Sequence, residues 1–350
     1  MKVLMIGPAR SVNGGISAVV NNYYKAGLDK IVQLRYIGTM EDGSKWHKLK
    51  VAVKAFIQFI FVAPGVDLVH IHMASDSSLY RKLSFIGLTK ILGKKLIIQQ
   101  HGGNIKHFFY SECGKKRQQF IKKILRKADS FLVVAPYLKD IFKDIVEEEK
   151  IIVFPNAIEI PGEIKPDYGR QNLLFLGRLC KEKGINELLE AIKELKQEFP
   201  NLQLYLGGVW VEEELKKKAQ LCDGFVHYLG WVDAKKKEEY LEKCNIFVLP
   251  TYFEGLPMSL LEGMAYGCAC VATEVGGIPQ VMTDRKDGIM IPAKDVQVLK
   301  GAIRELLINP ELQKEIGTNA RKTVENNYEI DKSVNKLVMI YKHLCDEWEK

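Results

Sequence analysis

Residues 246–267 read IFVLPTYFEGLPMSLLEGMAYG and contain one complete strand–turn–helix unit. Four consecutive apolar residues predict a buried strand over 246–249, and Gly255 permits a tight turn with close backbone approach. Pro257 suits the first position of a helix over 258–266, and Gly267 is placed to end that helix. A strand that leads through such a turn into a helix is the building unit of an α/β sheet.

The same alternation of short apolar runs and amphipathic segments continues along the whole chain. We expect strands at residues 2–6, 68–72, 95–99, 131–134, 151–154, 173–176, 203–206, 225–228, 246–249 and 269–272. We expect helices at residues 15–26, 78–92, 116–127, 185–199, 212–220, 234–243, 258–266, 296–307 and 333–348. The strands are almost continuously apolar, as strands covered on both faces are. The pattern therefore predicts an α/β fold with open parallel sheets.

Residues 159–167, EIPGEIKPD, form the expected boundary between two domains because they hold two Pro, one Gly and few apolar residues. We predict two Rossmann-like domains over residues 1–162 and 163–330, followed by a last helical segment over 331–350. Ligands of such sheets bind beyond the carboxyl ends of the strands. Two facing sheets would place the site in a cleft between the domains.

Composition and charge narrow the class of protein. The 350 residues are 47% hydrophobic, which excludes global disorder. Residues 1–160 hold 25 Lys and Arg against 13 Asp and Glu, so this half is expected to meet phosphate, a membrane surface or nucleic acid. The first apolar run is too short for a secretory signal, and the longest, over 51–64, predicts a buried or interfacial helix. Seven Cys without a C-x-x-C motif fit a reduced cytoplasm.

The helix after Gly255 is the first candidate binding element. Its N-terminus would present free N–H groups and a positive dipole end, which predicts an anion site and favours phosphate. Glu254 precedes this helix and Glu262 lies within it. Carboxylates accept hydrogen bonds from hydroxyls, so the two suit a ligand with a sugar on each side of a diphosphate. The structural alternative is that Glu254 caps the helix and Glu262 lies on a solvated face.

A second candidate is the loop after the strand at 173–176. Arg178 offers a planar fork and Lys183 a mobile charge for phosphate oxygens, and Gly177 and Gly184 bracket the turn. The alternative is an ordinary charged loop.

Two weaker candidates lie in the first half. Gly14 and Gly15 open a helix, but the loop lacks the G-x-G-x-x-G dinucleotide spacing. His101 ends a strand and could bind a sugar hydroxyl, although a lone histidine is more often structural. His70 and His72 share one strand face, but no third metal ligand can be named.

A basic tract runs from Lys94 to Lys127. It holds ten Lys and Arg against the single acidic Glu112, and HFFY interrupts it at 107–110. Basic residues with exposed aromatics suit an anionic membrane surface or single-stranded nucleic acid. The plainer interpretation is a solvated helix face.

Taken in order, these motifs resemble those of the retaining glycosyltransferases of family 4, with the GT-B architecture of two facing Rossmann-like domains. The likeness extends over essentially the whole chain, and its strongest element is E-x7-E, from Glu254 to Glu262. The supporting motifs are Gly177-Arg178 with Lys183-Gly184, Gly14-Gly15, His101-Gly102, Pro155-Asn156 and Gly276-Gly277-Ile278-Pro279. Three positions depart mildly from the family pattern, namely Ala157, Gly263 and Gln280.

The resemblance implies a role for each motif. Arg178 and Lys183 would hold the donor diphosphate, and Glu262 the nucleotide ribose. Glu254 would bind hydroxyls of the transferred sugar, and His101 would lie near that sugar, so His101, Glu254, Arg178 and Lys183 are the implied catalytic residues. The further implied donor contacts are Gly14, Gly15, Val232, Gly255, Leu256 and Pro257. The last helix would cross back to the N-terminal domain.

The implied reaction moves a hexosyl or N-acetylhexosaminyl group from a nucleotide-diphosphate sugar, a UDP-sugar foremost, to an acceptor hydroxyl with retention. The family generally needs no metal or other cofactor, because Arg, Lys and the helix N-terminus neutralise the leaving diphosphate. The expected acceptor is a lipid-linked glycan or an oligosaccharide in surface polysaccharide assembly. The expected place is the cytoplasm, at the inner face of an anionic membrane. The segment from Lys106 to Lys127, with Phe108, Phe109 and Tyr110, would dock there, and no nucleic acid is expected.

Other functions stay open at this point. A GT-B sugar-nucleotide epimerase or phosphorylase would share the fold, and a non-catalytic nucleotide- or polyanion-binding protein would explain the basic tract. A dehydrogenase is disfavoured, because the glycine fingerprint is absent.

Overall fold

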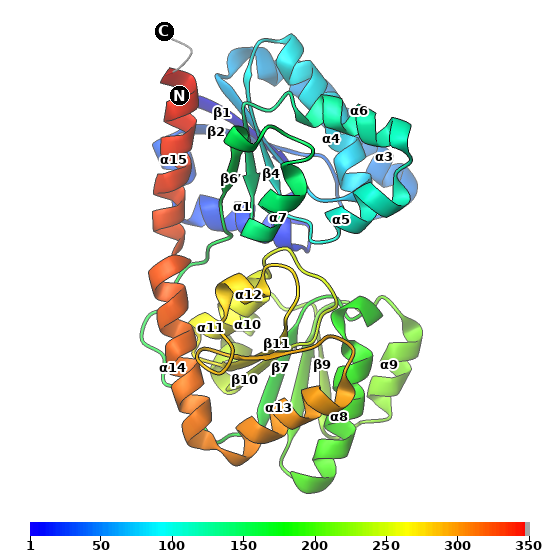
Figure 1. Ribbon diagram of the computed structural model, residues 1–350, viewed down its shortest axis with the longest axis vertical. Coiled ribbons are helices and arrows are strands. Elements are labelled where there is room, and N and C mark those ends of the chain that lie inside the picture. The colour runs from blue at the N-terminus through cyan, green and yellow to red at the C-terminus, as the bar shows by residue number, and fades with distance from the viewer. Residues whose placement is uncertain (347–350) are drawn as a thin grey trace. The chain divides into compact units, whose positions relative to one another are not determined.

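The computed structural model describes residues 1–346 and divides into two compact units (Figure 1). The first unit comprises Met1–Glu159 and the described chain from Ile330 onward, and the second comprises Ile160–Glu329. These divisions fall within three residues of the boundaries expected at 162 and 330. The expected last helix at 333–348 ends outside the described residues.

The first unit is built on a six-stranded parallel sheet in the order β2-β1-β3-β4-β5-β6. Its strands are β1 (Lys2–Gly7), β2 (Gln33–Gly38), β3 (Leu68–Met73), β4 (Lys95–Gln100), β5 (Ser130–Val133) and β6 (Ile151–Val153). Its helices are α1 (Gly15–Lys25), α2 (Leu28–Ile31), α3 (Lys45–Val62), η1 (Ala63–Gly65), α4 (Asp76–Ile91), α5 (Ile105–His107), η2 (Phe108–Glu112), α6 (Lys115–Leu125), α7 (Pro136–Phe142), η3 (Glu148–Lys150) and α15 (Ile330–Asp346). The strand order reverses between β1 and β3, so the loops after these strands flank a topological switch point.

The second unit repeats this plan with the order β12-β11-β10-β7-β8-β9. Its strands are β7 (Asn172–Leu176), β8 (Gln203–Gly207), β9 (Val226–Gly230), β10 (Ile246–Leu249), β11 (Ala269–Thr273) and β12 (Ile289–Ile291). Its helices are η4 (Lys181–Lys183), α8 (Ile185–Glu198), α9 (Glu213–Gln220), α10 (Ala234–Lys243), α11 (Met258–Ala265), α12 (Ile278–Val281), α13 (Val296–Ile308) and α14 (Pro310–Asn327). Here the order reverses between β7 and β10.

The central strands are buried along their whole length, as their apolar runs predict. Every residue of β3, β5, β10 and β11 is buried. Helices cover both faces of these sheets, which is why no polar alternation appears in the sequence.

The sequence patterns missed two edge strands and one long helix. In β2, Gln33 and Arg35 are exposed, so a half-solvated edge strand lacks the continuous apolar run of a central one. The short β12 pairs only with β11. Helix α14 begins at Pro310, where the Asn309 side chain accepts a hydrogen bond from the N–H of Leu312, which is a regular N-cap signal.

The last helix, α15, belongs to the first unit. Its apolar face buries Val334, Leu337, Tyr341 and Leu344. The Tyr341 hydroxyl lies 2.7 Å from His70 Nδ1 on β3, so the chain returns to the core of its N-terminal sheet.

The basic tract differs from the expectation of exposed aromatic anchors. Phe108 and Phe109 are buried in the first unit, and only Tyr110 of the three aromatics is exposed. The expectation that all three face a membrane is therefore wrong, because the η2 turn directs the two phenylalanines into the core.

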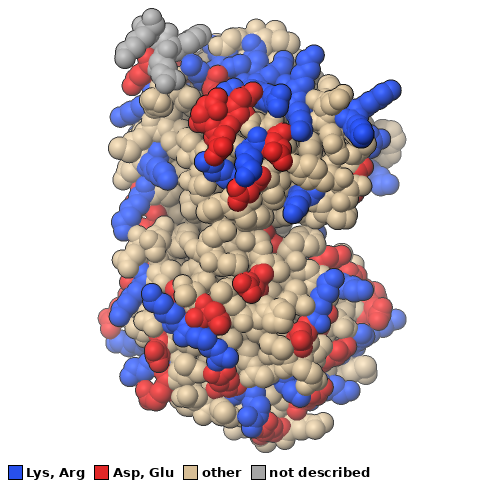
Figure 2. Space-filling view, in the orientation of Figure 1, with Lys and Arg blue, Asp and Glu red and all other residues tan. Residues whose placement is uncertain are grey.

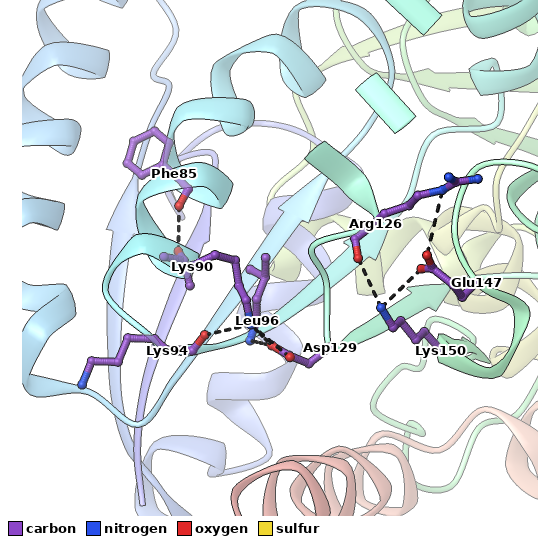
Figure 3. A network of polar contacts seen from close by, with 9 residues as sticks. Phe85, Lys90, Lys94, Leu96, Arg126, Asp129, Glu147 and Lys150 are labelled. Atoms are coloured by element: carbon purple, nitrogen blue, oxygen red, sulfur yellow. Dashed lines mark hydrogen bonds and ion pairs between the residues drawn. The ribbon is translucent and has the colours of Figure 1, made fainter. Parts of the chain in front are cut away.

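Arg126 of the tract, and two lysines that flank the tract, have acidic partners (Figure 3). Lys90 Nζ lies 2.9 Å from Asp129 Oδ2, and Asp129 also accepts the Leu96 N–H. Lys150 Nζ contacts both the Arg126 carbonyl and Glu147. Among the described residues, no helix is both long and apolar enough to cross a bilayer.

Candidate active site

The candidate site of the second unit lies at the carboxyl ends of β7 and β10, where the strand order reverses. In open α/β sheets this position is the usual ligand site, because the loops after the two strands diverge to opposite faces. The loop after β7 carries Arg178 and Lys183, and the loop after β10 carries Glu254. The topology therefore brings both sequence-predicted loops to one place.

Backbone contacts hold these two loops together. The Tyr252 N–H donates to the Glu182 carbonyl at 2.8 Å, and the Thr251 hydroxyl donates to the same oxygen at 3.3 Å. Gly184 has φ +70°, and a Cβ there would lie 2.0 Å from the Pro250 carbonyl oxygen. Only glycine permits this approach, so the second glycine of the loop is required by packing.

Lys183 and Glu254 form an ion pair between the two loops. Their side chains are 19% and 13% exposed, so both charged groups are largely withdrawn from solvent. The structure thus brings together a cation predicted for a diphosphate and a carboxylate predicted for sugar hydroxyls. Glu254 does not cap α11, whose N-cap residue is Pro257 and which has no side-chain cap bond.

Helix α11 begins next to this ion pair. Pro257, predicted at the first helical position, instead precedes it, one residue outside the first turn. Gly255, Leu256 and Pro257 are buried, and the N–H groups of the following turn have no partner within the helix. Gly267, with φ +70°, ends the helix as expected.

Glu262 on α11 is 16% exposed and accepts a hydrogen bond from Lys237 Nζ of α10 at 2.5 Å. It is therefore not a solvated face residue. The next residue, Gly263, faces the Phe247 ring of β10, where a Cβ would lie 2.7 Å from the ring. This contact gives a packing reason for glycine at the position.

The loop after β11 completes this edge of the sheet. Thr273 donates to the Thr251 carbonyl at 2.6 Å. Gly276 has φ +58°, and a Cβ there would lie 2.0 Å from the Glu254 carbonyl oxygen. The Gly276-Gly277 motif thus lets its loop pack directly against the backbone of Glu254.

The loops after β7 and β8 continue the sheet ladder beyond the strands. The Gly177 N–H donates to the Gly207 carbonyl at 2.9 Å, and Leu179 bridges to Trp210. Arg178 between them is exposed. The half-buried Val232 lies after β9 and contacts the carboxyl end of β8 at Gly207, the region predicted for the nucleotide base.

In the first unit, the predicted residues also follow strands at one sheet edge. Gly14 is the N-cap of α1, and both Gly14 and Gly15 have open space around the position of a Cβ. His101 follows β4, and its N–H donates to the Met73 carbonyl of β3 at 2.9 Å. The two glycines are therefore accessible, whereas His101 is held by the sheet.

His101 belongs to a column of three stacked imidazoles. His70 stacks on His72 with ring centroids 4.4 Å apart, and His72 stacks on His101 at 5.2 Å. His72 Nδ1 and His101 Nε2 share a hydrogen bond of 2.9 Å. Burial lowers the pKa of His101 to about 3, against the opposing effect of a hydrogen bond with Asn156. His101 is therefore a neutral imidazole at neutral pH, and its ring bonds to His72 and Asn156.

Three partners were not found from the sequence. Lys237 pairs with Glu262, His72 pairs with His101, and Gly208 approaches the Gly177 carbonyl so closely that a Cβ would lie 1.7 Å from it. Gly207-Gly208 directly follows an expected strand, so a glycine pair at that position was the available signal. The other two pairings have no sequence signal.

A pocket of about 620 Å³ opens in the first unit beside the loop after β1. Its basic lining residues are Arg10, Lys50 and Lys54, and its other polar lining side chains are Tyr36, Glu41, His47 and Gln58. The volume is that of a small-molecule site. The guanidinium of Arg10 lies 3.6 Å from the centre of the Tyr24 ring, which fixes the position of its charge.

Comparison with known proteins agrees with this geometry. The family model of glycosyl transferases group 1 matches residues 157–323, and that of glycosyltransferase family 4 matches residues 28–160. The chain is a family 4 glycosyltransferase. An uncharacterized glycosyltransferase of Methanocaldococcus jannaschii is 27% identical over 295 residues, which cover 82% of this chain and 78% of that protein.

The chain is also similar to two further proteins. One chain of the phosphatidylinositol N-acetylglucosaminyltransferase of Arabidopsis thaliana is 25% identical over 260 residues, 70% of this chain and 56% of that protein. The crystal structure of Anabaena HepE in complex with UDP-glucose superposes with a TM-score of 0.79 at 14% identity, covering 98% of this chain and 100% of the other. This likeness shows that the glycosyltransferase has the two-domain α/β GT-B fold.

Proposed function

We propose that this glycosyltransferase moves a hexosyl or N-acetylhexosaminyl group from a UDP-sugar to an acceptor hydroxyl with retention of configuration. The observation that carries the proposal is the Lys183–Glu254 ion pair at the β7–β10 switch point, beside the N-terminus of α11. A cation and a hydroxyl acceptor in contact suit the junction between a diphosphate and a sugar. The UDP-glucose in Anabaena HepE, which shares the fold, supports this type of donor.

The donor would be held along the edge of the second sheet. Arg178, Lys183 and the first turn of α11 would bind the diphosphate, and Glu254 the sugar hydroxyls. Glu262 would accept hydrogen bonds from the ribose, and Lys237 contacts the same carboxylate. Val232 would border the base.

The proposed chemistry needs no protein nucleophile. The bond between the anomeric carbon and the diphosphate oxygen breaks, and the acceptor oxygen bonds to the same face of that carbon. The acceptor proton passes to the departing diphosphate oxygen, so charge and atoms balance. Arg178, Lys183 and the α11 N–H groups stabilise the negative charge that develops on the diphosphate. We propose that these groups make a metal ion unnecessary, so turnover should persist in excess chelator.

The acceptor would be a lipid-linked glycan used in surface polysaccharide or glycolipid assembly. The pocket of the first unit supports an anionic acceptor, because Arg10, Lys50 and Lys54 line it. The name of the Arabidopsis relative, a phosphatidylinositol N-acetylglucosaminyltransferase, supports an acceptor that carries a lipid. The basic tract from Lys94 to Lys127 would add long-range attraction to an anionic membrane.

Thermal stability with UDP, GDP and ADP, each free and as a sugar conjugate, tests the donor. A ligand at 100 times its dissociation constant stabilises the folded state by about 2.7 kcal/mol, which shifts the melting temperature by a few degrees. We expect a shift with UDP compounds that is lost in Glu262→Ala and Arg178→Ala and kept in Lys181→Ala. No shift with any nucleotide would contradict the proposed donor site.

Product analysis tests the reaction. Release of UDP only when an acceptor is present, with an α-linked product from an α-linked donor, supports retaining transfer. A nucleotide sugar of unchanged mass but altered sugar configuration would indicate epimerisation instead. For the acceptor, Lys50→Glu with Lys54→Glu should raise the acceptor KM at least tenfold while leaving the UDP-dependent melting shift unchanged.

A further inference from the structure

Helix α3 carries most of its apolar side chains on the outside. Of its 18 residues, only Ala55 and Phe59 are buried. Trp46 and Phe61, near its two ends, are 75% and 80% exposed. The exposed large apolar side chains of α3 are Trp46, Leu49, Val53, Ile57, Ile60 and Phe61, six of the twenty-one in the described chain.

These side chains form one continuous stripe. Residues 46, 49, 53, 57 and 60 follow one another at steps of three or four, which places them on one face of a helix. Ala55 and Phe59 lie on the opposite face, which packs on the first unit. At 1.5 Å per residue the stripe from residue 46 to residue 60 is about 21 Å long. The core therefore does not account for the apolar character of this helix.

The formal charges on α3 itself all have one sign, although His47 of this helix contacts Glu41. The helix carries Lys45, Lys48, Lys50 and Lys54, and no Asp or Glu occurs between Asp42 and Asp67. Lys50 and Lys54 themselves line the 620 Å³ pocket, beside the stripe. An apolar face bordered by lysines is the pattern of a helix that lies in the surface of an anionic bilayer.

We propose that α3 is the membrane-docking element of this protein and lies in the headgroup region of an anionic lipid bilayer. The stripe would enter the boundary between headgroups and acyl chains, with Trp46 and Phe61 anchoring its two ends. The lysines would contact lipid phosphates, each strengthening binding about fivefold. The pocket mouth would then face the membrane surface through Lys50 and Lys54.

A second copy of the chain is a poorer occupant of this face. In a two-fold contact the same patch meets itself, so the lysine rows of α3 would oppose each other without acidic partners. The anionic bilayer supplies the opposite charge that a second α3 lacks.

The basic tract would have a different role from α3 in membrane binding. Helix α6 packs beside α4, which in turn contacts α3 (Figure 1), and it holds Lys115, Lys116, Arg117, Lys122 and Lys123. Figure 2 shows Lys and Arg side chains gathered along the upper edge of the first unit. Phe108 and Phe109 are buried, and this tract exposes only Tyr110 and Phe120 among its described large apolar side chains, against six on α3. Loss of α6 charge should therefore weaken attraction to the membrane without abolishing insertion.

The inference goes beyond the proposed sugar transfer, because lipid binding can be measured without donor or acceptor. The full-length protein is floated with vesicles of 30% phosphatidylglycerol in phosphatidylcholine and with vesicles of phosphatidylcholine alone. We expect binding to the anionic vesicles, reduced at least tenfold by Leu49→Ser with Ile57→Ser. The control, Ile91→Ser with Leu221→Ser, removes two apolar side chains outside α3 that are more exposed than Leu49 and Ile57, and it should bind as the unaltered protein does.

Depth is measured by quenching tryptophan fluorescence with brominated lipids, with Trp46→Phe identifying the signal of α3. The UDP-dependent melting shift serves as the folding control, since the α3 variants should keep it. Unchanged vesicle binding in the Leu49→Ser, Ile57→Ser variant would overturn the proposal, as would absence of binding to anionic vesicles. Concentration-dependent dimers that the same variant abolishes, without vesicle binding, would assign the face to a second copy.

Discussion

Lys183 and Glu254 are 71 positions apart in the sequence and form an ion pair where the loops after β7 and β10 meet. Neither partner is a general surface charge, because each side chain is less than a fifth exposed. The pair is tied to both strands through the contact of Gly184 with Pro250 and the hydrogen bond from Tyr252 to Glu182. Its position is thus set by the backbone of the switch point.

Removing Lys183 should impair catalysis more than folding. We expect Lys183→Ala to lower kcat/KM by about 100-fold or more, since it removes a charge that stabilises the leaving diphosphate. Lys183→Met and Glu254→Gln, singly and together, should show a coupling of about 0.5–3 kcal/mol in urea unfolding, because the residues are in direct contact. Lys181→Ala, an exposed lysine in the same loop, should change neither quantity. Wild-type turnover in Lys183→Ala would contradict the assignment.

Gly184→Ala should destabilise the second unit. Its φ of +70° strains any residue with a side chain, and the added Cβ would meet the Pro250 carbonyl. The left-handed backbone strain and the overpacking together should lower the free energy of unfolding, measured in urea, by about 2–5 kcal/mol. UDP binding should also be lost. Gly301→Ala, in the interior of α13 with open space around it, should instead stabilise by about 0.5–1 kcal/mol. Equal effects of the two substitutions would contradict the packing argument.

The buried histidine column should make the protein sensitive to acid. Burial lowers the pKa of His70 to about 3, below its ordinary 6.5, so between these values the unfolded chain binds a proton that the folded one does not. Stability is then retained above about pH 6.5 and falls as the pH drops toward 3. In urea titrations between pH 6 and 4, His70→Asn should reduce that slope by about 1.4 kcal/mol per pH unit. Substitution of the exposed His107 by Asn (His107→Asn) should leave the slope of stability against pH unchanged. An unaltered slope in His70→Asn would show that His70 is protonated in the folded state.

Lys82 on α4 should make the folding stability depend on pH in the alkaline range. Its side chain is buried and its Nζ donates to Thr39 Oγ1, and burial lowers its pKa to about 7 with a further contribution from Arg81. Since the unfolded chain keeps this proton to about pH 10, stability should rise between pH 7 and 10 by up to about 1.4 kcal/mol per unit. Lys82→Met should flatten that rise, whereas exposed Lys30→Met should not. Wild-type pH dependence in Lys82→Met would show that another group is responsible.

The central strands and the candidate loops could be predicted from the sequence for a local reason. Strands such as β3 and β10 are covered on both faces, so their apolar runs are unbroken, and the loops that follow them carry the Gly, Lys and Glu residues of the site. Edge strand β2 was missed because it alternates between exposed and partly buried residues. The sequence likewise contains no sign that Lys237 pairs with Glu262 or that His72 pairs with His101.

Two aromatic segments show that the local sequence pattern does not predict which side chains are buried. Phe108 and Phe109 sit within basic sequence and are buried, whereas Trp46 and Phe61 belong to an apolar helix and are exposed. The sequence by itself determined the strand–helix alternation, the family and the loops that carry the site, since these depend on neighbouring residues. Only the tertiary structure decided which aromatic side chains face solvent and which charged groups meet, because burial and ion pairing depend on elements far apart in the chain.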